Sequence, residues 1–132
     1  MNIILLIIMT IALYKPTWMD VVRFLERDHT NWQAFTADHS CEAFALDLEN
    51  AAKEEGLNFY RVRVNFENGA AHIFNAIETS DHGTIYIEPQ EDYRYATPKV
   101  GGYLCWNDTG TCWKADGMKI TEIIEYDKVE AK

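Results

Sequence analysis

The chain has 132 residues, of which 48% are hydrophobic, 25% charged and 13% aromatic, a composition typical of one folded domain. Asp and Glu outnumber Lys and Arg by 21 to 12, the formal net charge is -9, and the chain has no run of basic residues. Because phosphate binding needs clustered cations, we expect no nucleic-acid partner, and the lack of repeats or biased tracts excludes collagen-like, disordered and solenoid proteins.

The N-terminal segment, residues 1–14, is apolar from Ile3 to Leu13 except at Thr10. This run is too short to span a bilayer as a helix. It therefore predicts a signal-peptide remnant, a membrane anchor, or a buried helix or strand of the core, and these alternatives stay open. We assign residues 15–132 to a single domain.

A first helix is predicted to begin after Thr17, which can act as its N-cap, with Asp20 at the third helical position. It should end near Asp28. Residues 29–39 then show neither helical nor strand periodicity, so they predict a loop, in which Trp32 could line a cleft. The apolar residues of this helix share one face: Trp18, Val21, Val22 and Leu25.

The second predicted helix has the clearest pattern in the sequence. Ser40 is a good N-cap, Cys41 is the first helical residue, and Gly56 ends the helix. Its apolar residues follow helical spacing: Cys41, Phe44, Ala45, Leu48, Ala51 and Ala52.

Strands are predicted after Gly56, where the periodicity changes to two along residues 60–66. The dipeptide Asn68-Gly69 predicts a turn. Further strands are expected over residues 70–79, 84–88, 101–106, 111–115 and 119–126, as a meander. Helices followed by strands predict an α+β domain, in which an antiparallel sheet packs on the central helix that carries Cys41.

Three residues in this arrangement indicate chemistry. The Cys41 thiol would lie among unpaired N–H groups at the positive end of a helix, which favours the thiolate. His72 lies on one strand and Glu88 ends the next, so an odd number of connecting residues, or one bulge, would place both on the same face. Cys, His and carboxylate could then act as nucleophile, base and orienting group.

A structural interpretation stands beside this one, because free cysteines are often buried as small apolar residues and are inert without a base. The other two cysteines, Cys105 and Cys112, flank turn-forming residues and could face each other across a hairpin. The chain contains no His or Cys spacing typical of metal ligands, so we expect no metal and no cofactor.

Three stretches resemble the transglutaminase-like superfamily, which has a papain-like core: the helix from Cys41 to Gly56, the sequence His-Ile-Phe-Asn that begins at His72, and the strand from Gly83 to Glu88. The similarity extends over about residues 16–127 and is greatest to an uncharacterised prokaryotic branch. The resemblance implies that Cys41 is the nucleophile and His72 the base. Glu88 stands where the family has its orienting Asp.

The resemblance implies a thiol-dependent acyl-transfer enzyme, an amide or peptide hydrolase or a transamidase, with a Cys-His-Glu triad and a peptide or protein substrate. Because Glu is one methylene longer than Asp, the alternative is a non-catalytic binding or structural module that keeps the fold. Members of this branch are often exported or membrane-anchored. We therefore favour an extracytoplasmic or membrane-associated protein, tethered through its N-terminal segment, over a cytoplasmic one.

Overall fold

The described structure, a computed structural model, comprises residues 15–30, 36, 39–90 and 93–128. The alternatives for the segment 1–14, including a membrane tether, and the expectation for Trp32 lie outside the described residues. Within these ranges, no helix combines the length and the apolar character needed to cross a membrane.

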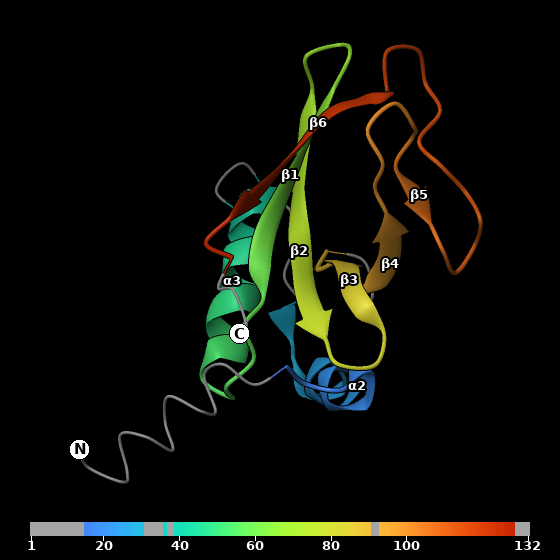
Figure 1. Ribbon diagram of the computed structural model, residues 1–132. Helices are drawn as coiled ribbons and strands as arrows, with labels where there is room; N and C mark the ends of the chain where they lie inside the picture. Colours follow the sequence, from blue (N-terminus) through green and yellow to red (C-terminus); the bar gives the residue numbers. More distant parts are fainter. Residues whose placement is uncertain (1–14, 31–35, 37–38, 91–92, 129–132) are drawn as a thin grey trace, which may run out of the picture.

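Two helices precede the strands in the described part of the chain (Figure 1). α2 spans Trp18–Arg27 and begins with a capping box: Thr17 Oγ1 accepts from the Asp20 N–H at 3.2 Å, and Asp20 Oδ2 accepts from the Thr17 N–H at 3.0 Å. α3 spans Cys41–Lys53 and is followed by Gly56 at φ +78°, a conformation that glycine adopts without strain. Both predicted helices are therefore present.

Six antiparallel strands form one curved sheet with the order β5-β4-β3-β2-β1-β6. The Gly101 N–H donates to the Ile120 carbonyl and the Ile120 N–H to the Gly102 carbonyl, both at 2.8 Å, so the sheet curls into half of a barrel. The predicted α+β fold, with an antiparallel sheet packed on the helix of Cys41, is confirmed. The strands are β1 Tyr60–Phe66, β2 Ala71–Thr79, β3 Gly83–Glu88, β4 Arg94–Thr97, β5 Cys105–Trp106 and β6 Ile120–Tyr126.

Three details of the predicted meander are wrong. The strand β4 is missing from the prediction, because four residues before a proline carry too little pattern. The predicted strand 101–106 is only the two residues of β5, and residues 111–115 contribute a single bridge, because turns between them use the backbone groups. β6 does not follow β5 in the sheet but pairs with the outer edge of β1.

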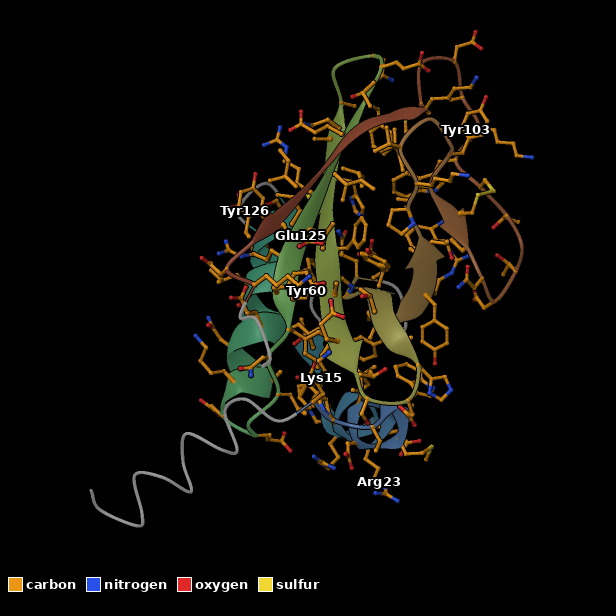
Figure 2. The ribbon with its side chains drawn as sticks, in the orientation of Figure 1. Lys15, Arg23, Tyr60, Tyr103, Glu125 and Tyr126 are labelled. Carbon is orange, nitrogen blue, oxygen red and sulfur yellow. A yellow bond between two sulfur atoms is a disulfide. The ribbon has the colours of Figure 1, made fainter. Side chains whose placement is uncertain are left out.

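An apolar core lies on each face of the sheet. The alternation of β2 separates them, because Phe74 joins one core and Ile77 the other. On the helix side, α2 buries Phe24, whereas Val22 of the predicted face is only half-buried. Figure 2 shows Arg23 pointing away from the sheet on the opposite side of α2. The core on the helix side consists of Val21, Phe24, Leu25, Leu48, Ala52, Phe59, Ile77 and Ile87.

The strands β2 and β3 separate at one end of the sheet. Their pairing ends at Asn75 and Ile87, so residues 71–74 of β2 have no neighbour on that side. β3 continues by one residue, in which Glu88 pairs with Arg94 of β4. Figure 1 shows β3 and β4 diverging from the upper half of β2. The candidate site lies at this opening.

Candidate functional site

Cys41 is the first residue of α3, so its thiol lies at the helix N-terminus. The first intrahelical bond is the 3.0 Å bond from the Phe44 N–H to the Ser40 carbonyl, which leaves the N–H groups of residues 41–43 without an intrahelical partner. Ser40 has the backbone of an N-cap, but its side chain makes no capping hydrogen bond. The helix N-terminus therefore acts on the half-buried thiol without competition from the Ser40 hydroxyl.

His72 and Glu88 lie on the same face of the sheet. Thr79 pairs with Gly83, so three residues connect β2 and β3, an odd number as this placement requires. The imidazole Nε2 and the Oε2 oxygen of Glu88 form a hydrogen-bonded ion pair. The structure therefore brings together two of the three residues singled out in the sequence.

The Glu88 carboxylate is almost fully buried, with 2% of the residue exposed. One oxygen bonds to His72, and the other accepts a hydrogen bond from the Gln90 N–H at 3.1 Å. With both oxygens bonded, the carboxylate fixes the orientation of the imidazole. Because Nε2 of His72 is used by Glu88, Nδ1 is the ring nitrogen that remains for the Cys41 thiol.

Cys41 and His72 come from opposite faces of the sheet and meet at the opening between β2 and β3. α3 packs on the face of Asn75, whose Nδ2 donates to the Ala45 carbonyl at 2.9 Å. His72 lies on the other face, where its ring stacks on Phe74. Since β3 leaves this part of β2 unpaired, the thiol lies near the imidazole at the strand edge, close enough for His72 to lower the pKa of the thiol.

Both members of this pair have shifted pKa values. The hydrogen bond with His72 lowers the pKa of the Cys41 thiol from its usual value of 9.0, against the effect of partial burial, and the backbone N–H groups of Ile73 and Glu42 lower it further. Burial acts to lower the pKa of His72, but its bonds to Cys41 and Glu88 outweigh this effect and raise the pKa to about 9. These shifts favour a thiolate and an imidazolium over the two neutral groups.

Two tryptophans form a wall beside His72. The Trp113 ring lies edge-on to the imidazole, with centroids 5.1 Å apart, and 5.5 Å from the Trp106 ring. With Glu88 and Gln90, these side chains line a cavity of about 60 Å³, enough for on the order of one or two water molecules. The side chains of His72 and Glu88 are 12% and 3% exposed, and this burial strengthens the hydrogen bond between them.

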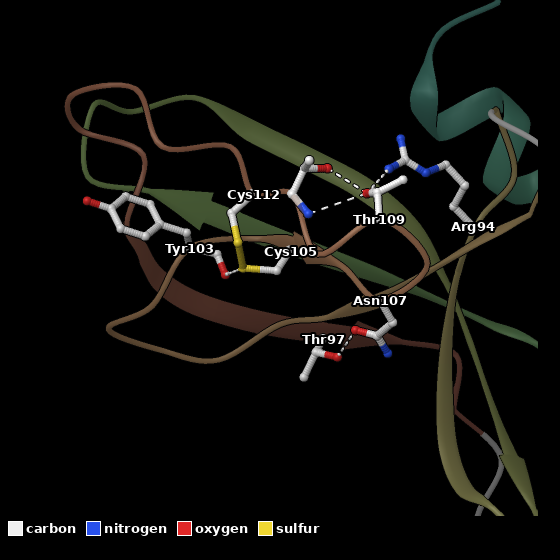
Figure 3. The surroundings of a disulfide bond; sticks show 8 residues. Arg94, Thr97, Tyr103, Cys105, Asn107, Thr109 and Cys112 are labelled. Atoms are coloured by element: carbon white, nitrogen blue, oxygen red, sulfur yellow. Dashed lines mark hydrogen bonds between the residues drawn. A yellow bond between two sulfur atoms is a disulfide. The ribbon is translucent and has the colours of Figure 1, made fainter.

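A disulfide closes the turn that precedes Trp113 (Figure 3). Cys105 and Cys112 face each other across this turn, with their Cα atoms 4.0 Å apart, and are bonded. The turn is also held from outside, because Arg94 Nη2 donates to Thr109 Oγ1 at 2.9 Å. Since Trp113 directly follows Cys112, the disulfide fixes the position of the ring that contacts His72.

The groups around the three side chains are the ones that the sequence does not reveal. Ile73 and Gln90 contribute backbone N–H groups, for which no residue type is diagnostic. Trp113 belongs to a different part of the chain and reaches His72 only through the fold. A helix-capping residue without a capping bond, such as Ser40, likewise gives no sequence signal.

Two other histidines, His39 and His82, lie beside carboxylates outside the site. His39 Nε2 is 3.2 Å from Asp47, and His82 Nδ1 is 3.2 Å from Asp81. Within residues 15–30, 36, 39–90 and 93–128, no group of three or more His, Cys, Asp or Glu side chains could hold a metal ion.

Comparisons with family models, curated proteins and solved structures gave no match to this chain. The resemblance to the transglutaminase-like superfamily therefore depends on the motifs at Cys41, His72 and Glu88 alone.

Proposed function

We propose that the protein is a thiol-dependent acyl-transfer enzyme, a hydrolase or transamidase acting on amide bonds of peptides or proteins. Cys41 is the nucleophile, His72 the general base and acid, and Glu88 the group that orients the imidazole. The observation that carries this proposal is the convergence of three side chains: His72 is hydrogen-bonded to the buried carboxylate of Glu88, and the Cys41 thiol at the start of α3 lies close enough to His72 for the imidazole to lower its pKa.

The first step forms a thioester on Cys41. The thiolate attacks the carbonyl carbon of the substrate amide, and the electron pair of the C=O bond moves to oxygen. The Cys41 N–H, at the start of α3, donates to this oxyanion. As the C–N bond breaks, the imidazolium of His72 gives its Nδ1 proton to the leaving amine.

The second step releases the acyl group. Neutral His72 takes a proton from water or from a second amine, which attacks the thioester and expels the Cys41 thiolate. Water yields a carboxylic acid, and an amine yields a new amide. Throughout both steps Glu88 holds Nε2, so that Nδ1 stays directed at the sulfur and the positive imidazole is compensated.

The order of elements supports a transglutaminase-like core as part of this proposal. A Cys begins a helix that packs on an antiparallel sheet, and the His and the acid come from two consecutive strands of that sheet. The chain departs from the family in having Glu88 for Asp. The longer side chain still bonds to the imidazole, which favours an active enzyme over the non-catalytic module.

The disulfide supports the expected location outside the cytoplasm. Disulfides persist mainly in secreted, periplasmic and cell-surface proteins, because the cytosol keeps thiols reduced. The Cys105–Cys112 bond beside the site agrees with an extracytoplasmic or membrane-associated enzyme.

Alkylation of Cys41 by iodoacetamide across pH 4 to 10 tests the proposal. We expect fast labelling of the natural protein below pH 7, because the imidazolium stabilises the thiolate. The variant His72→Ala should react only near the usual thiol pKa of 9.0, with labelling at pH 6 slower by tenfold or more, about one pKa unit. Mass spectrometry of the labelled peptide identifies the residue.

An acyl-trapping activity probe supplies the second readout. It should label the natural protein and leave the matched variant Cys41→Ser unlabelled. Equal alkylation profiles for the natural protein and His72→Ala, without probe labelling, would instead support the non-catalytic binding or structural module.

A further inference from the structure

At Ile73, the backbone N–H and C=O groups of β2 point toward the opening. In an antiparallel sheet, successive residues direct their N–H and C=O groups to alternate sides of the strand. The Phe66 N–H donates to the Ala70 carbonyl at 2.9 Å, so the backbone groups of Ala70 point toward β1. By the same alternation, the backbone groups of His72 also point toward β1. Ile73 therefore directs its backbone groups to the other side, toward β3.

On that side Ile73 has no strand partner. Pairing between β2 and β3 ends at Asn75 and Ile87, so the Ile73 N–H is outside the ladder. A backbone N–H removed from water needs an acceptor. The group at the opening is the sulfur of Cys41. The Ala45 carbonyl, one helical turn after Cys41, accepts from Asn75 Nδ2 at 2.9 Å, which places the start of α3 beside Ile73, and the Ile73 N–H acts to lower the pKa of the thiol.

The residue that would continue the ladder is Pro89. Extending the register beyond Asn75 and Ile87 places Pro89 opposite Ile73. Proline has no N–H to donate, so it cannot complete the pairing with the Ile73 carbonyl. Pro89 therefore ends the pairing of β2 with β3 at the position where the sulfur needs a free donor.

We propose that the Ile73 N–H is a catalytic group, which holds the Cys41 sulfur in its anionic form beside the imidazole of His72. This inference rests on the proposed function. The thiol proton moves to Nδ1 of His72, and the Ile73 and Glu42 N–H groups keep their own protons while they bond to the negative sulfur. Because a main-chain group is the donor, the side chain of residue 73 is not part of this role.

Replacing the amide nitrogen of residue 73 by oxygen tests the proposal. Incorporation of the α-hydroxy acid analogue of isoleucine removes the N–H and keeps the side chain. We expect the thiol pKa to rise by about one unit and iodoacetamide labelling of Cys41 at pH 6 to slow about tenfold. The matched control is the same replacement at Ala71, which also faces the β3 side but is two residues away, and it should change the rate by less than about twofold.

The natural protein gives an independent measurement that needs no variant. In a pH titration by NMR, the Ile73 amide proton should move downfield with the apparent pKa found by labelling Cys41, while that of Ala71 should not follow it. An Ile73 amide that ignores this titration, or a folded ester variant with the natural pH profile, would overturn the inference. A thiol pKa of 9.0 in the natural protein would overturn the proposed function itself, so the two failures are distinct.

Discussion

Glu88 is the residue at which the proposed triad differs from that of the family it resembles, which has Asp in this position. It is buried, and it is bonded to His72 and to the Gln90 N–H. A buried carboxylate is costly unless a cation compensates it, so Glu88 favours the imidazolium form of His72. The imidazolium in turn favours the Cys41 thiolate. A substitution of Glu88 should therefore change the pKa of the Cys41 thiol, although Glu88 does not contact the sulfur.

We expect Glu88→Gln to lower the pKa of His72 from about 9 toward its usual 6.5 and to raise the pKa of the Cys41 thiol. The amide keeps the shape of the side chain but removes the charge that stabilises the imidazolium. Iodoacetamide labelling of Cys41 at pH 6 should slow about tenfold, the effect of one pKa unit. NMR titration of the imidazole provides the second measurement.

Glu88→Asp is the matched control, because it keeps the charge and withdraws it by one methylene. Its labelling rate should lie between those of the natural protein and Glu88→Gln. Identical pH profiles in the three proteins would contradict a role for Glu88 in the triad.

At the scale of elements, the turn between β5 and Trp113 carries the aromatic ring that lies against the His72 imidazole. The disulfide of Cys105 and Cys112 ties the ends of this turn, and the Trp113 ring that follows is 37% exposed. The ring packs against Phe66 and Trp106 as well as the imidazole, and the Trp113 N–H donates to the Leu104 carbonyl at 3.0 Å. The covalent bond one residue away adds a further constraint on its position.

The double variant Cys105→Ser/Cys112→Ser should lose about 2–3 kcal/mol of unfolding free energy, the loss expected for a short disulfide loop. It should also slow Cys41 labelling at pH 6, because a displaced Trp113 admits water to the His72–Glu88 bond and weakens it. Urea denaturation and the labelling rate measure the two effects.

The variant Trp113→Phe separates the effect on stability from the effect on Cys41 labelling. It keeps the disulfide and an aromatic ring, so it should retain most of the unfolding free energy. A double variant whose stability and labelling rate equal those of the natural protein would show that the disulfide does not support the site.

At the scale of the whole molecule, the three cysteines divide into the free thiol of Cys41 and the Cys105–Cys112 disulfide. Both lie near His72. Cys41 approaches His72 from the helix side of the sheet, and Cys112 brings Trp113 to it from the other side. The proposed activity thus needs a disulfide between Cys105 and Cys112 to be compatible with a reduced sulfur at Cys41. In an oxidising compartment the disulfide forms, and Cys41 stays reduced only if no other cysteine can pair with it.

Counting thiols tests this division. Denatured without reductant, the protein should give one thiol per chain with a chromogenic disulfide reagent, and after reduction it should give three. Peptide mapping should assign the single thiol to Cys41. Three thiols before reduction would show that the disulfide does not form, and no thiol would show that Cys41 pairs between chains.

Features that depend on neighbouring residues followed from the sequence. The capping box of Thr17 and Asp20, the helical spacing after Cys41 and the alternation of β1 are all set by backbone geometry over a few residues. The common face of His72 and Glu88 did not follow in this way. The predicted strands 70–79 and 84–88 leave four connecting residues, whereas in the structure Gly83 pairs with Thr79 and leaves three.

Features that depend on distant segments were decided by the tertiary structure. β6 pairs with β1, and β4 exists only because β3 and β5 flank it. The opening at Ile73 arises where β3 leaves β2, and it lets a thiol and an imidazole from opposite faces of the sheet meet. Local periodicity says to which face a side chain points, but strand partners and the places where they separate depend on long-range packing, which no local pattern encodes.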